Sequence, residues 1–171
     1  MKPLDDDVEY LDLGLVQIPL LFDPEIRLNI DQESMLVVGF AIIIGSSMAE
    51  VQLFARAKDE LLWPEVRDDL VRALTEQGIQ HEVVIGEFGS EVRTVMPLQD
   101  IDGNNVLQSV RFVGVDGDRW FLRAAISGAA AVSEIEINQM DQLIANIKVE
   151  RGIHPMPPGE LMTFSMPEFG E

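Results

Sequence analysis

The stretch from 110 to 128, VRFVGVDGDRWFLRAAISG, constrains the fold more than any other part of the chain. Asp116 and Gly117 separate two runs rich in β-branched and aromatic residues. Such a pair is typical of a type I′ hairpin turn, whose two central residues need positive φ. A two-residue turn here would place Val115 opposite Asp118 and Val113 opposite Trp120, so the stretch predicts a tight antiparallel hairpin.

Both faces of this predicted hairpin carry large apolar side chains. One face would hold Val113, Val115, Trp120, Leu122, Ala124 and Ile126. The other would hold Phe112 and Phe121 together with Arg119 and Arg123. A strand that is apolar on both sides is typical of a sheet with both faces covered, so we expect layers above and below the hairpin.

The rest of the chain alternates between a period of two and a period of about 3.6. Four strands in a meander are predicted at 12–18, 26–30, 35–44 and 48–57. Further strands are predicted at 81–85, 91–96 and 147–150, with a polar loop at 97–105. The pattern therefore favours an α+β fold, in which a largely antiparallel sheet of seven to nine strands is flanked by two main helices.

The two helices are predicted at 63–77 and 133–145. Trp63-Pro64 places proline at the first helical position, and Gly78 is a suitable left-handed cap after the last turn. Ser133 and Glu136 have the spacing of a capping box at the start of the second helix.

Composition suggests one domain with two distinct ends. We expect an acidic arm over 1–10, a single α+β domain over 11–153 and an extended, proline-rich tail over 154–171. Two interpretations of the tail remain open: it packs on its own domain, or it docks on another chain through Leu161, Phe164 and Met166. Removing 155–171 would separate them, because loss of stability would favour the first.

The charge balance excludes some classes of partner. The 171 residues include 12 Lys and Arg against 30 Asp and Glu, a formal net charge of −18. A chain of this charge is a poor ligand for nucleic acid, whereas a basic protein partner would be attracted. The longest apolar run, 35–44, is too short to span a bilayer, and the first residues do not resemble a signal peptide. We therefore expect a cytoplasmic protein.

Four arginines in predicted strands form the main candidate ligand site: Arg93, Arg111, Arg119 and Arg123. Arg119 and Arg123 are four residues apart, so in one strand they would share a face with Phe121. Paired guanidinium groups recognise phosphate or carboxylate in a planar, two-pronged way. The alternative is that the arginines pair with the chain's own carboxylates, as buried arginines usually do.

Neither a catalytic centre nor a metal or cofactor site is indicated. The two histidines, His81 and His154, lack metal-binding spacing, and the chain has no cysteine. The segment 100–105 has its glycine at the wrong place for a calcium loop. Ser127 lies outside any nucleophile-elbow pattern.

Four segments together resemble a known family. RFVGVDGDRWFLRAAISGAAA, FARAKDELLWPEVRDDLVRALTEQG, EFGSEVRTVMP and MPPGEL are similar to the actinobacterial domain-of-unknown-function family 3710, from about Leu11 to Pro167. The resemblance implies a lineage and a cytoplasmic setting, and it supplies no catalytic residue. The order of elements is similar to the PsbP-like fold, whose members are mostly binding or assembly factors.

The sequence thus favours a non-enzymatic interaction or assembly module that acts through its acidic surface and its C-terminal tail. A small-anion-binding regulator that uses the four arginines is the competing function. An enzyme with an unrecognised site is a third.

Overall fold

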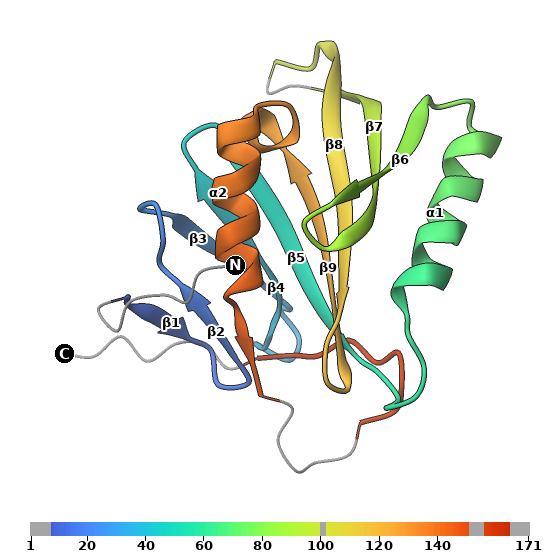
Figure 1. The fold of residues 1–171 in the computed structure, drawn as a ribbon. Helices are drawn as coiled ribbons and strands as arrows, with labels where there is room; N and C mark the ends of the chain where they lie inside the picture. The colour runs from blue at the N-terminus through green and yellow to red at the C-terminus, as the bar shows by residue number, and fades with distance from the viewer. Residues whose placement is uncertain (1–7, 100–101, 151–155, 165–171) are drawn as a thin grey trace.

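A computed structural model describes residues 8–99, 102–150 and 156–164, and over these residues the chain is α+β with antiparallel sheets and two α-helices (Figure 1). The larger sheet has seven strands in the order β3 (Glu25–Ile30), β4 (Val37–Ile44), β5 (Ser47–Ala55), β9 (Trp120–Ser127), β8 (Asn105–Asp116), β7 (Gly89–Gln99) and β6 (His81–Gly86). The smaller sheet has three strands, in the order β1 (Tyr10–Asp12), β2 (Val16–Pro19) and β10 (Lys148–Val149). The predicted α+β class is confirmed.

The core lies between the larger sheet and α2 (Glu134–Ala145), which crosses one face of that sheet (Figure 1). We call this the covered face and the opposite one the open face. Alternate residues of the strands, such as Ile42, Leu53 and Leu122, point from the covered face toward Met140 and Leu143 of α2. A short 3₁₀ turn, η1 (Gly128–Ala131), joins β9 to this helix. The smaller sheet closes the core with Val16 and Ile18 of β2.

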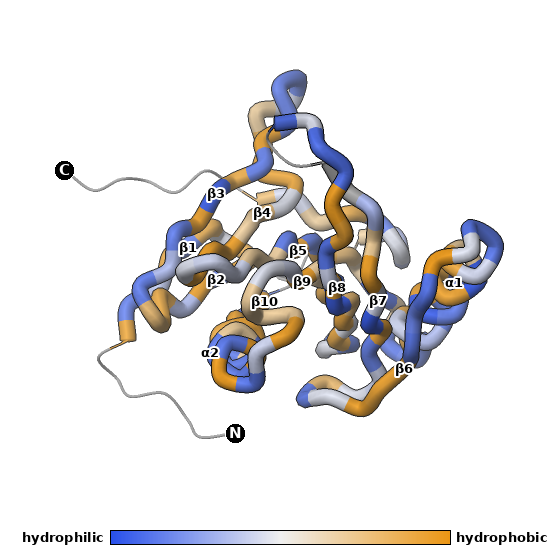
Figure 2. The backbone as a smooth tube through the Cα atoms, turned by 90° about the horizontal axis from the view of Figure 1, so that it is seen from above, coloured by the Kyte–Doolittle hydropathy of each residue, from blue (hydrophilic) through white to orange (hydrophobic). Residues whose placement is uncertain are grey.

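The other helix, α1 (Trp63–Glu76), lies at the far end of the sheet near β6, β7 and β8 (Figure 2). The predicted bounds of both helices are close to those observed, and Gly78 follows α1 with a φ of 70°. At α2 the expected capping box does not form, because the Ser133 hydroxyl donates to the Glu136 carboxylate instead of capping the backbone. No helix over the described residues is long and apolar enough to cross a membrane.

The predicted first strand at 12–18 is wrong, since the structure places a turn inside it. Gly14 has a φ of 90°, and its amide donates to Oδ1 of Asp12 at 2.8 Å. This side-chain-stabilised turn reverses the chain, so that β1 and β2 pair with each other and leave the meander. The meander therefore consists of β3, β4 and β5.

The central hairpin is present, but its predicted register is wrong by four residues. Val115 lies opposite Leu122 and Val113 opposite Ala124, where the sequence placed Asp118 and Trp120. The positive φ belongs to Arg119, at 63°, so the reversal is made by the residues after Asp116. An even shift keeps every side chain on its face, which is why the predicted apolar face was still correct.

Asp116 is the last residue of β8 and not part of the turn, because its side chain caps the start of α1. Its two carboxylate oxygens accept from the amides of Leu62 and Trp63 at 2.9 and 3.0 Å. Arg56 lies beside it at 3.6 Å and also donates to the carbonyl oxygens of Gly117 and of the loop that precedes the helix. The first amides of a helix lack internal partners and favour a carboxylate, so the hairpin tip fixes where α1 starts.

The hairpin of β7 and β8, which precedes the central hairpin in the chain, is longer than predicted. The segment 97–105, expected as a loop, begins and ends in strands, with Pro97 opposite Leu107. Pairing with β6 stops at Thr94, so Pro97 has a neighbouring strand on only one side and its missing amide hydrogen is tolerated.

The described part of the tail packs into its own chain. Phe164 pairs with Val37 of β4, and the Met162 amide donates to the carbonyl of Leu53 at 2.8 Å. Met162 and Phe164 are buried in the core cluster. Phe164, predicted as a partner contact, is therefore an internal core residue, and Leu161 is half-buried where it pairs with Phe54. Met166 and residues 1–7 of the predicted arm lie outside the described residues, while Tyr10 begins β1.

Candidate functional site: a groove on the open sheet face

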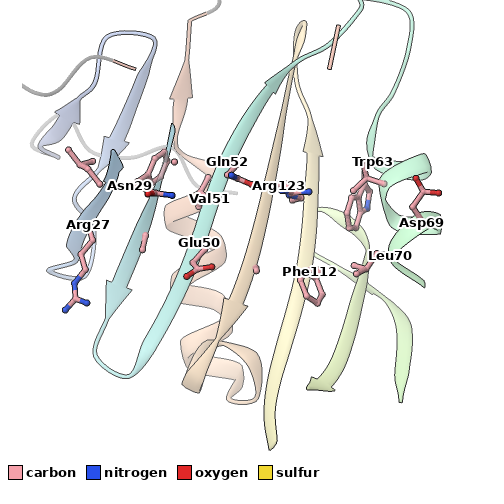
Figure 3. Close-up of a pocket in the computed structure, with 16 residues that line it drawn as sticks. Arg27, Asn29, Glu50, Val51, Gln52, Trp63, Asp69, Leu70, Phe112 and Arg123 are labelled. Atoms are coloured by element: carbon pink, nitrogen blue, oxygen red, sulfur yellow. Dashed lines mark hydrogen bonds between the residues drawn. The ribbon is translucent and has the colours of Figure 1, made fainter. Parts of the chain in front are cut away.

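A groove of about 800 Å³ runs along the open face, between the strands and the flank of α1 (Figure 3). Its floor is the part of the sheet formed by β3, β4, β5, β9 and β8, and its wall is the helix. The helix covers only the β6 to β8 end of this face, so the prediction that both faces are covered is correct for one face and for only part of the other.

The floor contains a row of directly paired residues. Arg27, Ala41, Glu50, Ala125 and Phe112 are successive partners across the five strands. Small residues therefore stand on both sides of Glu50, and they leave its side chain in an open space. A second row pairs Gln52 with Arg123, and both side chains point into the groove (Figure 3).

Glu50 is the most available charge in this floor. Its side chain is exposed, and among the described residues no ion pair or hydrogen bond engages its carboxylate. The other acidic residue of the lining, Asp69 on α1, pairs with Arg72 at 3.0 Å. Glu50 can therefore accept a cation from an incoming molecule without breaking a contact of the folded chain.

The wall is apolar and firmly held. Val66 and Leu70 of α1 face the groove beside Trp63, and Phe112 continues this surface onto β8. The Trp63 indole donates to the carbonyl of Ser90 at 2.7 Å, and its ring covers Gly114 so closely that a Cβ there would lie 2.3 Å away. The wall is thus a preformed surface that an apolar side chain can contact.

Arg123 stands between the floor and the wall. Its guanidinium donates to the Gln52 side chain and lies 5.2 Å from the centre of the Phe54 ring. It remains exposed. Arg27, at the other end of the floor, pairs with Glu25 at 3.0 Å. The groove therefore combines both signs of charge with an apolar side.

The four predicted arginines do not meet in one place. Arg123 lies on the open face, whereas Arg111 and its cross-strand partner Arg93 lie on the covered face. Arg119 is in the hairpin turn and not in a strand, so it does not share a strand face with Arg123. The expected cluster is thus divided among three locations.

Arg111 is fully occupied inside the protein. It donates to Glu91 at 2.7 and 3.1 Å, to Asp141 of α2 at 3.0 Å and to the carbonyl of Ala130 at 3.0 Å. Arg93 adds a further bond to Glu91 at 3.0 Å. This network, which joins β7 and β8 to η1 and α2, corresponds to the alternative in which the arginines pair internally.

The network shifts the pKa values of its two carboxyl groups in opposite directions. Burial by itself would raise the pKa of Glu91, but hydrogen bonds and charge from Arg111 and Arg93 outweigh it and lower that pKa. Burial dominates at Asp141 and raises its pKa in spite of Arg111. Both effects are the usual response of a carboxyl group to desolvation and to a neighbouring cation.

The remaining candidates are dispersed. The Nδ1 atom of His81 donates to the carbonyl of Ile79 at 2.9 Å, and His154 lies outside the described residues. No group of three or more His, Cys, Asp or Glu side chains that could hold a metal occurs in the described ranges.

Sequence reasoning missed Glu50, Arg56 and the capping role of Asp116. Glu50 has no distinguishing signal in the sequence, because Ala41 and Ala125 become its neighbours only through strand pairing, and Ala125 is distant in sequence. The sequence predicts Asp116 as a turn residue, which is the commoner role of Asp before Gly. The pairing register reveals Glu50, and the contact between the hairpin and the start of α1 reveals Asp116.

Comparison with known proteins places the chain in a family without adding a function. No curated protein and no solved structure matches it. The PsbP-like architecture expected from the order of elements therefore stays a prediction. The resemblance seen in the four sequence segments is confirmed, since the family described as protein of unknown function (DUF3710) matches residues 1–170. The chain belongs to this DUF3710 family.

Proposed function

We propose that this chain is a non-enzymatic protein-interaction module that holds a segment of a partner protein in the groove. The observation that carries the proposal is the chemistry of the groove: the unengaged Glu50 carboxylate in its floor faces space beside an apolar wall of Leu70 and Phe112. A segment with one basic and one apolar side chain at suitable spacing would satisfy both features.

The net charge supports a basic segment in particular. A chain with a charge of −18 attracts cations over its whole surface and steers a basic partner toward an encounter. We therefore expect the partner segment to carry Lys or Arg toward Glu50. The cytoplasmic, actinobacterial setting belongs to the same proposal, and the absence of cysteine leaves the chain indifferent to the redox state of its compartment.

The test is tagged purification of the full chain at moderate salt, with mass spectrometry of what co-purifies. Glu50→Arg reverses the charge of the floor, and Ala125→Trp fills the space beside it. Glu150→Arg is the matched control, because Glu150 is exposed and does not line the groove. We expect a stoichiometric partner with the wild type and the control, and its loss with both groove variants.

A partner that all four proteins retain would overturn the groove as the binding site. A chain that purifies alone would overturn the interaction module itself. Thermal melts of each variant show whether a lost partner reflects binding or misfolding.

The second candidate function, small-anion binding, is favoured by Arg123, whose exposed guanidinium lies in the same groove above Phe54. Phosphate would then raise the melting temperature of the wild type, and replacing Arg119 and Arg123 by methionine would abolish that rise. An unchanged phosphate effect in the double variant would contradict this function.

A further inference from the structure

The strand β6 forms one edge of the seven-stranded sheet. It pairs with β7 along its full length, from His81 opposite Thr94 to Gly86 opposite Gly89. On its other side no strand of the described residues follows, and β6 lies at the rim of the fold (Figure 2). An edge strand presents unpaired backbone amides and carbonyls, which can pair with another chain.

This edge has little of the usual protection. Its sequence, HEVVIG, contains no lysine or proline, and Ile85 and Val83 are 81% and 49% exposed on one face. The opposite edge strand, β3, instead presents the charged Glu25 and Arg27. Natural sheets keep edges apart with charges, prolines or bulges; the one carboxylate of β6, Glu82, alternates onto the other face, so the face that carries Val83 and Ile85 is open to pairing with another strand.

We propose that a second copy of this chain pairs with β6, antiparallel and about a two-fold axis through Val84. In that register Val83 of one copy faces Ile85 of the other, twice, and Val84 faces Val84. Glu82 faces Gly86 of the second copy, so no carboxylates are directly opposed. A two-fold interface must be complementary to itself, and this strand is.

The pairing of side chains supports the same register. The next pair along this face brings His81 of one copy toward Glu87 of the other. An axis at Val83 would place Ile85 opposite His81, and an axis at Ile85 would place Val83 opposite Glu87. Only the axis at Val84 matches apolar with apolar side chains at both ends.

This interface does not depend on the proposed groove, and salt distinguishes the two. Two copies with a charge of −18 each repel one another, so added salt should strengthen pairing through β6. A basic partner segment in the groove should instead bind less tightly as salt rises.

The absence of cysteine makes a direct test simple. In Val84→Cys the only two thiols of a dimer lie opposite each other across the axis, within reach of a disulfide or a short bismaleimide. Leu107→Cys is the matched control, since Leu107 is 74% exposed and belongs to β8. We expect Val84→Cys to cross-link efficiently and Leu107→Cys to cross-link weakly, although Leu107 is on a more accessible surface. Equal cross-linking of the two variants, or more at Leu107, would overturn the proposal.

Sedimentation equilibrium provides a second test that needs no cross-link. Ile85→Lys should raise the dimer dissociation constant by about tenfold or more, because it removes two apolar cross-strand pairs from a two-fold interface. Leu107→Lys should leave the constant unchanged. A wild-type chain that stays monomeric up to high protein concentration in 0.5 M salt would overturn the second-copy interface.

Discussion

Arg111 is the centre of the buried network on the covered face. Its guanidinium is fully buried and contacts both Glu91 and Asp141. Arg93, the other cation of this network, is partly exposed and contacts Glu91. Arg111→Met would leave two buried carboxylates without this partner, and we expect a loss of about 3–5 kcal/mol in the free energy of unfolding. Urea unfolding monitored by tryptophan fluorescence measures it.

Arg93→Met is the matched control at the same glutamate. Arg93 is half-exposed and Arg111 would still hold Glu91, so the expected loss is about 1 kcal/mol or less. Equal losses for the two variants would contradict the assignment of Arg111 as the centre of the network.

Glu91 should make stability depend on pH. Its pKa is lower in the folded chain than its ordinary value of 4.5. A carboxyl group of this kind stabilises the fold above its unfolded pKa, and the contribution is lost as the pH falls through the folded pKa. The difference in unfolding free energy between wild type and Glu91→Gln should thus be largest near neutral pH and shrink below about pH 4.5. A difference that stays constant down to pH 3 would contradict this role.

Asp141 should act in the opposite sense. Its raised pKa means that the folded chain binds a proton more tightly than the unfolded chain does. The charged form therefore costs stability at neutral pH, and acid relieves that cost. The acid response of the wild type is the sum of the two, which is why single substitutions are needed to separate them.

At the scale of elements, the start of α1 depends on a residue from another hairpin. Asp116→Ala removes the acceptor of two helix amides, and we expect a loss of about 1–2 kcal/mol in unfolding free energy, together with faster hydrogen exchange at the amides of Leu62 and Trp63. Asp118→Ala, in the same turn but exposed, should change stability by less than about 0.5 kcal/mol. Unchanged exchange at the two amides in Asp116→Ala would contradict the cap.

The described tail should behave as part of the core. Phe164→Ala removes a buried ring that packs against the core cluster, and the expected loss in unfolding free energy is about 3–5 kcal/mol. Leu161→Ala, at a half-buried position three residues earlier in the tail, should cost clearly less. If both substitutions left thermal unfolding unchanged, the tail would be a detachable segment.

The elements themselves were largely predictable, and their pairing was not. Periodicity located both helices within a residue or two, because each buries one stripe of apolar side chains. It failed at 12–18, where Gly14 and Asp12 form a turn inside an alternating run. Periodicity also misplaced the hairpin register. The Asp116 carboxylate accepts from amides at the start of α1, which is distant in sequence, so Asp116 does not enter the turn.

The same limit applied to the candidate site. Four arginines close together in predicted strands suggested one cluster, but the parity of the strands places Arg111 and Arg123 on opposite faces. The groove is built from five strands and a helix, so no short stretch of sequence contains it. Its key carboxylate, Glu50, is visible only after Ala41 and Ala125 are known to flank it.

At the scale of the whole molecule, the two faces of the larger sheet differ in what they contact. The covered face carries the buried network and the core, whereas the open face keeps space beside α1 for a partner. The edge at β6 offers a separate surface to a second copy. A dimer formed there would keep both grooves on the same side of one continuous sheet, because the two-fold axis is perpendicular to it.

Photo-crosslinking from inside the groove shows whether the groove binds a protein. A photoreactive phenylalanine analogue at Ala125, in the floor, is compared in cells with the same analogue at Glu150, outside the lining. We expect the Ala125 position to capture one protein, cross-linked through a segment that contains Lys or Arg next to an apolar residue, and we expect the Glu150 position not to capture it. Capture of the same proteins from both positions, or of none from Ala125, would contradict the groove as a protein-binding site.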